Sequence, residues 1–240
     1  MKPGALGLAA ILAITSCGTP GRQSAESPVI PPGRVTDFPL LYAQNCAGCH
    51  GPDGQGGLAV ALGDPVYLAI ADDTTIRRVT AEGVSGTAMP AFAQQAGGML
   101  TDAQVDIIVS GIRSRWAKPG ILGQAKPPAH ATNAQGDPKH GETVFTIYCS
   151  SCHGVSGRGG ERAGSIVDGS YLALVSNQHL RTIVIVGLPS MGAPDWRGDV
   201  PGKPLSDSDV TDVVAWLAAQ RPKSAKQLYS TSQSAGGEIQ

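Results

Sequence analysis

One short pattern of cysteine, histidine and glycine occurs twice in the chain and constrains any fold that the chain can adopt. The first copy starts at Cys46 and reads CAGCHGPDGQGG, and the second starts at Cys149 and reads CSSCHGVSGRGG. The copies lie 103 residues apart and share two cysteines, the histidine that follows them and four glycines. The chain must therefore build the same local structure twice.

The sequence Cys-x-x-Cys-His is typical of covalent c-type haem attachment. Its two thiols can add to the haem vinyl groups, and the adjacent imidazole can ligate the iron from one side. A redox dithiol or a zinc site is the alternative, but a zinc ribbon brings two Cys-x-x-Cys pairs into one small domain. We therefore predict two covalently bound haem c groups, held by the thiols of Cys46, Cys49, Cys149 and Cys152 and by the iron ligands His50 and His153.

The two copies remain similar well beyond this motif, at an offset close to 104 residues. The segment DPVYL matches DGSYL, and LTDAQVDIIVSGI matches LSDSDVTDVVAWL. In addition, Arg77 and Gly83 match Arg181 and Gly187. Self-similarity of this extent indicates a duplicated domain.

Each copy ends in a predicted helix. Thr101 with Gln104 predicts a capping box, and Ser206 with Asp209 predicts a near version of one. Apolar residues follow both caps at the three- and four-residue spacing of a helix face. Further helices are expected around residues 37–45, 74–80, 139–148 and 179–186 and no sheet is expected, which makes the fold class all-α.

This order of elements resembles the class I cytochromes c, in which an N-terminal helix, Cys-x-x-Cys-His, a methionine loop and a C-terminal helix follow one another. The resemblance implies two tandem domains of this kind, at residues 36–117 and 137–222. The family often has a proline soon after the motif whose carbonyl orients the histidine ring. Glycines follow the motif here, so the resemblance leaves the partners of the two histidines open.

The resemblance also implies a methionine sulfur on the opposite side of each haem. Met89 lies 39 residues after His50 and Met191 lies 38 residues after His153, each in a loop that contains proline. We therefore predict Met89 and Met191 as the sixth iron ligands. Met99 has no counterpart in the second copy and is expected to pack beside a helix cap. His179, His130 and His140 are the alternative ligands, although surface or capping roles are favoured for all three.

The N-terminal residues predict export. An apolar run from Ala5 to Ile14 follows Lys2 and is shorter than the roughly 20 residues that span a bilayer, as expected of a signal peptide. Residues 14–17 resemble a bacterial lipobox, which predicts a signal peptide at 1–16 and lipidation of Cys17. The alternative is a small buried cysteine after an ordinary signal. We expect a lipid-anchored protein on the periplasmic side of a membrane, because bacteria attach haem covalently outside the inner membrane.

Three further segments are expected to connect or extend the domains. They are a tether at residues 17–35, a proline- and glycine-rich linker at 118–136 and a flexible polar tail at 223–240.

These features favour an electron carrier over an enzyme, because an iron with both axial positions filled has no ready place for a substrate. The expected partners are a redox protein donor and acceptor, including subunits of a respiratory or photosynthetic complex. A net charge of −1 gives no case for nucleic acid. The alternatives are a dihaem enzyme, such as a cytochrome c peroxidase or a thiosulfate-oxidising cytochrome, and a structural docking subunit of a larger complex.

Overall fold

Helices dominate the structure, a computed structural model that describes residues 30–57, 59–198, 200 and 202–223. Within these residues, extended pairing is limited to the isolated bridges Ala93–Leu100 and Leu188–Ala193, which confirms the predicted all-α fold. No helix in this part of the chain is long and apolar enough to cross a membrane. The predicted signal peptide, Cys17 and most of the predicted tether and tail lie outside the described residues.

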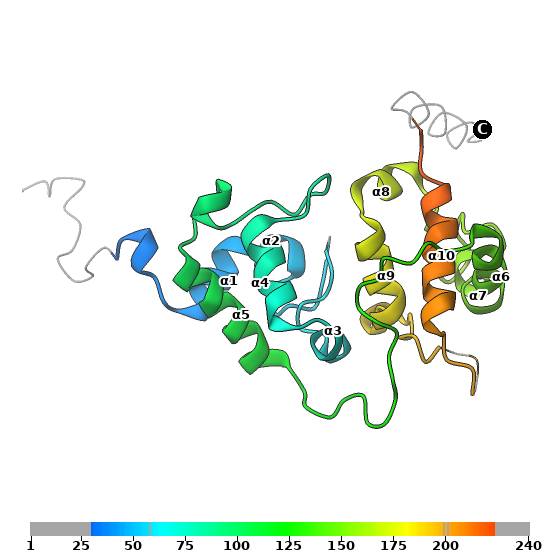
Figure 1. Ribbon diagram of the computed structural model, residues 1–240, viewed down its shortest axis with the longest axis horizontal. Coiled ribbons are helices and arrows are strands. Elements are labelled where there is room, and N and C mark those ends of the chain that lie inside the picture. The colour runs from blue at the N-terminus through cyan, green and yellow to red at the C-terminus, as the bar shows by residue number, and fades with distance from the viewer. Residues whose placement is uncertain (1–29, 58, 199, 201, 224–240) are drawn as a thin grey trace, which may run out of the picture.

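The helices form two bodies with the same order of elements, which lie side by side in Figure 1. The first body contains α1 (Phe38–Asn45), α2 (Ala47–His50), α3 (Pro65–Ile70), α4 (Asp73–Glu82) and α5 (Asp102–Trp116), with the short turns η1 (Pro32–Arg34) and η2 (Gln94–Ala96). The second body contains α6 (Pro138–Tyr148), α7 (Ser150–His153), α8 (Gly169–Leu174), α9 (Asn177–Val186) and α10 (Asp207–Ala219), with the turn η3 (Pro189–Met191).

Side-chain caps start the equivalent helices of both bodies, which is why the repeated sequence folds twice in the same way. The capping box predicted at Thr101 and Gln104 is complete at the start of α5. The capping box at Ser206 and Asp209 is equally complete at the start of α10. The backbone N–H of each residue donates to the side-chain oxygen of the other. Such caps satisfy N–H groups that a helix leaves unpaired.

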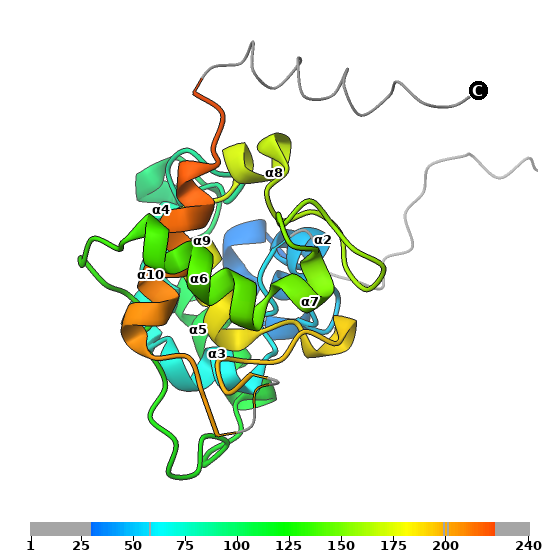
Figure 2. The ribbon, with the colours of Figure 1, turned by 90° about the vertical axis from the view of Figure 1, so that its right-hand side faces the viewer.

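The first and last helices of each body cross at a glycine. In the first body, Phe38 of α1 lies over Gly111 of α5, where an added Cβ would come within 2.1 Å of the phenylalanine ring. In the second body, Gly141 of α6 lies over α10, and an added Cβ would come within 2.0 Å of the Asp212 carbonyl oxygen. Figure 2 shows α6 lying across α10. Because the motif directly follows α1 and α6, this close crossing fixes the position of each motif relative to the last helix of its body.

The matched arginines Arg77 and Arg181 tie the fourth helix of each body to the last helix. Arg77 donates to Asp106 at 2.7 Å and to Asp102 at 3.3 Å, with a side chain that remains 40% exposed. Arg181 is only 3% exposed and donates to Asp207 and, at 2.9 Å, to Thr211. The same contact is therefore a surface ion pair in the first body, whereas in the second body the arginine is buried and its carboxylate partner is half-exposed.

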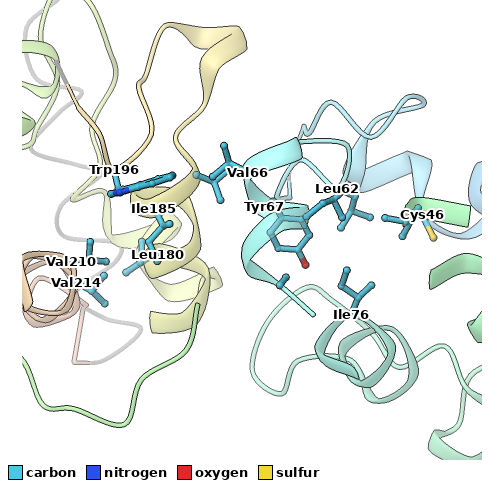
Figure 3. Close-up of a cluster of buried hydrophobic side chains, with 14 of the residues drawn as sticks. Cys46, Leu62, Val66, Tyr67, Ile76, Leu180, Ile185, Trp196, Val210 and Val214 are labelled. Carbon is cyan, nitrogen blue, oxygen red and sulfur yellow. The ribbon is translucent and has the colours of Figure 1, made fainter. Parts of the chain in front are cut away.

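The predicted linker packs against both bodies. The N–H of Ala129 donates to Asp207 at 2.9 Å, and its carbonyl accepts from Arg181 at 2.9 Å. The ring of His130 lies edge-on to Tyr67 of α3, with centroids 6.1 Å apart. At the boundary between the bodies, Figure 3 shows Val66 of α3 facing the side that carries Trp196.

Candidate haem sites

The motif forms one short helical turn in each body. The N–H groups of Cys49 and His50 both donate to the Cys46 carbonyl, at 3.2 and 3.0 Å. The N–H groups of Cys152 and His153 donate to the Cys149 carbonyl at the same two distances. Both thiols and the imidazole are thus presented from a single turn, and none of these four cysteines is in a disulfide.

The first cysteine of each motif has surroundings unlike those of a redox-active thiol. Burial, and then the neighbouring Cys49, raises the pKa of Cys46 to about 12, and burial beside Cys152 raises the pKa of Cys149 to about 11. Thiol–disulfide exchange depends on a thiolate, which redox-active sites obtain by lowering the pKa. The raised pKa of the first cysteine of each motif is the opposite of what a redox-active dithiol needs.

Loop carbonyls orient both histidine rings. Nδ1 of His50 lies 2.8 Å from the carbonyl oxygen of Val60, and Nδ1 of His153 lies 2.8 Å from that of Gly164. Because a carbonyl can only accept, Nδ1 carries the proton and the lone pair of Nε2 remains available for a metal. The role that a proline carbonyl often has in class I cytochromes c is taken here by Val60 and Gly164.

His50 shows the feature expected of an axial ligand. Its Nε2 is buried and has no hydrogen-bond partner, alone in this respect among the side chains of the described residues. Burial lowers the pKa of His50, against an opposing contribution from the Val60 hydrogen bond, and so keeps the imidazole neutral. A buried nitrogen without a partner is costly unless something binds it, and a haem iron fits this position.

The repeated glycines shape the loop that follows each histidine. Gly51 and Gly154 have φ values of 81° and 73°, and an added Cβ would lie 2.6 and 2.3 Å from the carbonyl oxygens of Gly56 and Gly159. The chain turns back at this point, and the N–H groups of Gly56 and Gly159 donate to the two motif histidines' carbonyls at 2.9 Å. Glycine is needed here for both conformation and space.

The loops between the fourth and the last helix make matching backbone contacts in the two bodies. The N–H of Val84 donates to the carbonyl of Met89 at 3.0 Å, and the N–H of Leu188 donates to the carbonyl of Ala193 at 3.0 Å. Each acceptor is followed by a proline, and each donor follows a glycine, Gly83 or Gly187. The residue in the position of Met89 is therefore Ala193.

Met191 occupies an earlier position in this loop. Its N–H donates to the carbonyl of Leu188 at 2.8 Å, as that of Thr87 donates to the carbonyl of Val84 at 3.2 Å. Met191 is 79% exposed, whereas Met89 is partly buried. The near-equal spacing from the motif histidines does not make the two methionines equivalent. Met99 is 80% exposed, so its predicted packing role is wrong.

The three other histidines have different surroundings. Nδ1 of His140 lies 2.8 Å from Oδ2 of Asp212, and His130 lies against Tyr67. His179 is in the first turn of α9, where burial, and then the nearby His50, lowers its pKa. His140 and His130 thus have polar and aromatic partners, while His179 lies within electrostatic reach of His50 across the boundary between the bodies.

Comparison with known proteins identifies both bodies. The family described as cytochrome c oxidase, cbb3-type, subunit III matches residues 34–110 and again residues 136–217. The cbb3-type cytochrome c oxidase subunit CcoP of Azospirillum sp. is 30% identical over 139 residues, which are 53% of this chain and 41% of CcoP. The cytochrome bc1 complex cytochrome c subunit of Mycobacterium tuberculosis is 24% identical over 215 residues, covering 88% of this chain and 70% of that one.

Among solved structures, a Kuenenia stuttgartiensis reducing HAO-like protein complex matches with a TM-score of 0.43 at 17% identity, covering 77% of this chain and 96% of the other. The chain spans about two fifths of the length of CcoP. Two family matches in tandem correspond to two cytochrome c domains with two covalently bound haem c groups. The chain belongs to the family of cbb3-type cytochrome c oxidase subunit III.

Proposed function

We propose that this protein is a dihaem electron carrier that passes electrons between redox proteins. Its domains are residues 36–117 and 137–222, joined by the linker at 118–136. Each domain attaches one haem through the two cysteines of its motif and ligates the iron with the histidine that follows. Met89 and Met191 supply the sixth ligands.

The observation that carries this proposal is the state of the two histidine rings. Each donates from Nδ1 to a loop carbonyl at 2.8 Å, and the Nε2 of His50 is buried without a partner. A ligating histidine is held in this way in metal sites, because the hydrogen bond fixes both its tautomer and its orientation. The same Nδ1–carbonyl hydrogen bond in both bodies supports one function performed twice.

The protein's own residues hold and orient each haem. Haem iron supplies the one-electron chemistry when it is bound, and thioether ligation raises its potential relative to a second imidazole. The Val60 and Gly164 carbonyls accept from Nδ1 of the two imidazoles and so fix the orientation of each ring, with Nε2 directed to the iron. Buried apolar side chains in the helices that precede the motifs, among them Leu41 and Phe145, would limit the reorganisation that accompanies each electron transfer.

The partners that we propose are a redox donor and acceptor in a membrane respiratory complex. The relatives support this, since the names of CcoP and of the mycobacterial subunit place them in a cbb3-type oxidase and in a bc1 complex. A terminal oxidase or a quinol-oxidising complex would supply a partner on the periplasmic side.

We further propose that Cys17, after removal of residues 1–16, carries a lipid that anchors the protein to the membrane through the tether at 17–35. The lipobox-like residues 14–17 support this. More than one acyl chain is needed for stable anchoring. Cys17→Ala should release the exported protein from membranes of a strain without partner complexes, and membrane binding that survives the change would exclude the anchor.

Electron delivery tests the function directly. Membranes from a strain that lacks this protein should regain oxygen uptake with a quinol when the purified wild-type protein is added. Two variants each lack one attachment site: Cys46→Ala/Cys49→Ala and Cys149→Ala/Cys152→Ala. Each should fail to restore oxygen uptake if the haem that it lacks lies on the route of electron transfer. Arg77→Ala, which alters a surface ion pair, is the matched control and should restore uptake. No restoration by the wild-type protein would exclude the proposed role.

A further inference from the structure

The two domains differ at the loop that supplies the sixth ligand, and this difference has a consequence for the second haem. In the first domain, Met89 stands at the base of the loop, where its carbonyl accepts from Val84 and its N–H lies 3.2 Å from the Thr87 hydroxyl oxygen. In the second domain, Ala193 stands at this base and has no side chain with which to ligate iron.

Met191 lies in a closed turn instead. Leu188 and Ala193 exchange both backbone hydrogen bonds, at 3.0 and 3.1 Å, which closes the loop at its base. Within it, the N–H groups of Met191 and Gly192 donate to the carbonyls of Leu188 and Pro189 at 2.8 and 3.1 Å. Gly192 has a φ of 81°, so the turn reverses directly after Met191.

This turn holds Met191 away from the base of the loop. Met191 and Ala193 are two residues apart, so their Cα atoms are separated by at most about 7 Å. The methionine side chain is flexible, but it starts from an exposed position at the end of η3. Ligation by Met191 would therefore require the turn to move inward, and that movement would break some of the backbone hydrogen bonds that close it. Their loss would weaken the net interaction of Met191 with iron, in the second domain only.

We propose that the sixth ligand of the second haem is displaceable, because Met191 reaches the iron only when the Leu188–Ala193 turn opens. The ligand class is a small neutral iron-binding molecule such as carbon monoxide. On Fe(II), carbon monoxide would take the place of the Met191 sulfur, so that an iron–carbon bond would replace the iron–sulfur bond with no change of oxidation state. The first haem, with Met89 at the base of its loop, resists the same ligand. This inference rests on the proposed function, in which Met191 is the sixth ligand.

Carbon monoxide titration of the fully reduced dihaem protein tests the inference. We expect one haem of two to bind at a concentration at least tenfold below that needed for the other. Ala193→Met puts a thioether at the base of the loop. It should raise the carbon monoxide concentration at which the first haem to respond becomes half-saturated at least tenfold. Ala193→Leu is the matched control, similar in volume but without sulfur, and should leave this concentration nearly unchanged. Met89→Leu should add a second low-concentration phase.

Equal binding by both wild-type haems would overturn the inference, and so would a first phase that Ala193→Met leaves unchanged. Met191→Leu separates this failure from failure of the proposed ligand set. Loss of one of the two near-infrared thioether–Fe(III) signals in this variant establishes Met191 as a ligand, whatever the carbon monoxide result. Retention of both signals would remove Met191 from the ligand set and overturn the inference with it.

Discussion

Nδ1 of His50 lies 2.8 Å from the carbonyl oxygen of Val60, while Nε2 of the same ring is buried without a hydrogen-bond partner. The ring is therefore fixed at one edge and open to a ligand at the other. In the second domain, Gly164 holds His153 at the same distance. These paired contacts fix the orientation of the two motif imidazoles, which would ligate the two irons.

Replacing Met89, which we propose as the sixth ligand of the first haem, should change the potential of that haem without opening the iron. We expect Met89→His to remain low-spin and to lower that haem's potential by on the order of 0.1 V or more, because imidazole favours Fe(III) more than thioether does. A spectroelectrochemical titration measures this, with the second haem as internal reference. A shift of both potentials by the same amount would show that Met89 acts on the protein generally and not on one iron.

The equivalent arginines Arg181 and Arg77 should contribute very differently to stability. Arg181→Ala removes bonds to Asp207, Thr211 and the Ala129 carbonyl from a buried site and should cost about 3 kcal/mol of unfolding free energy. Arg77→Ala removes a surface ion pair and should cost at most about 1 kcal/mol. Urea unfolding of the haem-containing protein measures both, and equal losses would contradict the structure.

The crossing of α6 and α10 should not tolerate one added methyl group. Gly141→Ala places a Cβ against the Asp212 backbone, which cannot move without shifting α10, so we expect a loss of about 2 kcal/mol or more. Glu142→Ala, at the exposed neighbouring position, should change stability by less than about 0.5 kcal/mol. Thermal unfolding compares the two variants, and a neutral Gly141→Ala would place the helices further apart than described.

His140 should make stability depend on pH near neutrality. Its hydrogen bond to Asp212 raises the pKa of His140 above the ordinary value of 6.5, with smaller contributions from the Asp209 and Asp137 charges. Since the folded pKa is the higher one, this stabilisation is complete below about pH 6.5 and is lost as the pH rises through the folded pKa.

We therefore expect His140→Gln to remove a stability loss that the wild-type protein shows between pH 6 and pH 8, measured by urea midpoints. Burial lowers the pKa of His130, which contributes with the opposite sign and is present in both proteins. Their difference thus isolates His140. Identical pH profiles would show that the pair with Asp212 contributes nothing in solution.

The sequence predicted the helices well because local signals determine them. The Thr101 and Ser206 caps and the apolar stripes behind them act within a few residues, and both capping boxes are present in the structure. The duplication gave the same information twice. The buried state of Arg181 was not predictable in this way, since it depends on the linker at Ala129, far away in sequence.

The methionine loops show where counting residues misleads. Gly83 lies 33 residues after His50, but Gly187 lies 34 residues after His153. Residues at equal distances from the two histidines are therefore no longer equivalent by the start of the loop. A comparison anchored on Gly83 and Gly187 pairs Met89 with Ala193 directly. The acceptors Val60 and Gly164 could not be predicted either, because the carbonyl that a loop presents depends on its backbone path and not on its side chains.

The haem stoichiometry of motif variants tests the central claim most directly. Haem stain on denaturing gels, with iron and protein quantified on the same samples, should give two covalently bound haems per wild-type chain. Cys46→Ala/Cys49→Ala and Cys149→Ala/Cys152→Ala should each give one. Haem that acid–organic extraction removes from the wild-type protein, or a stoichiometry that either double variant leaves unchanged, would contradict the account.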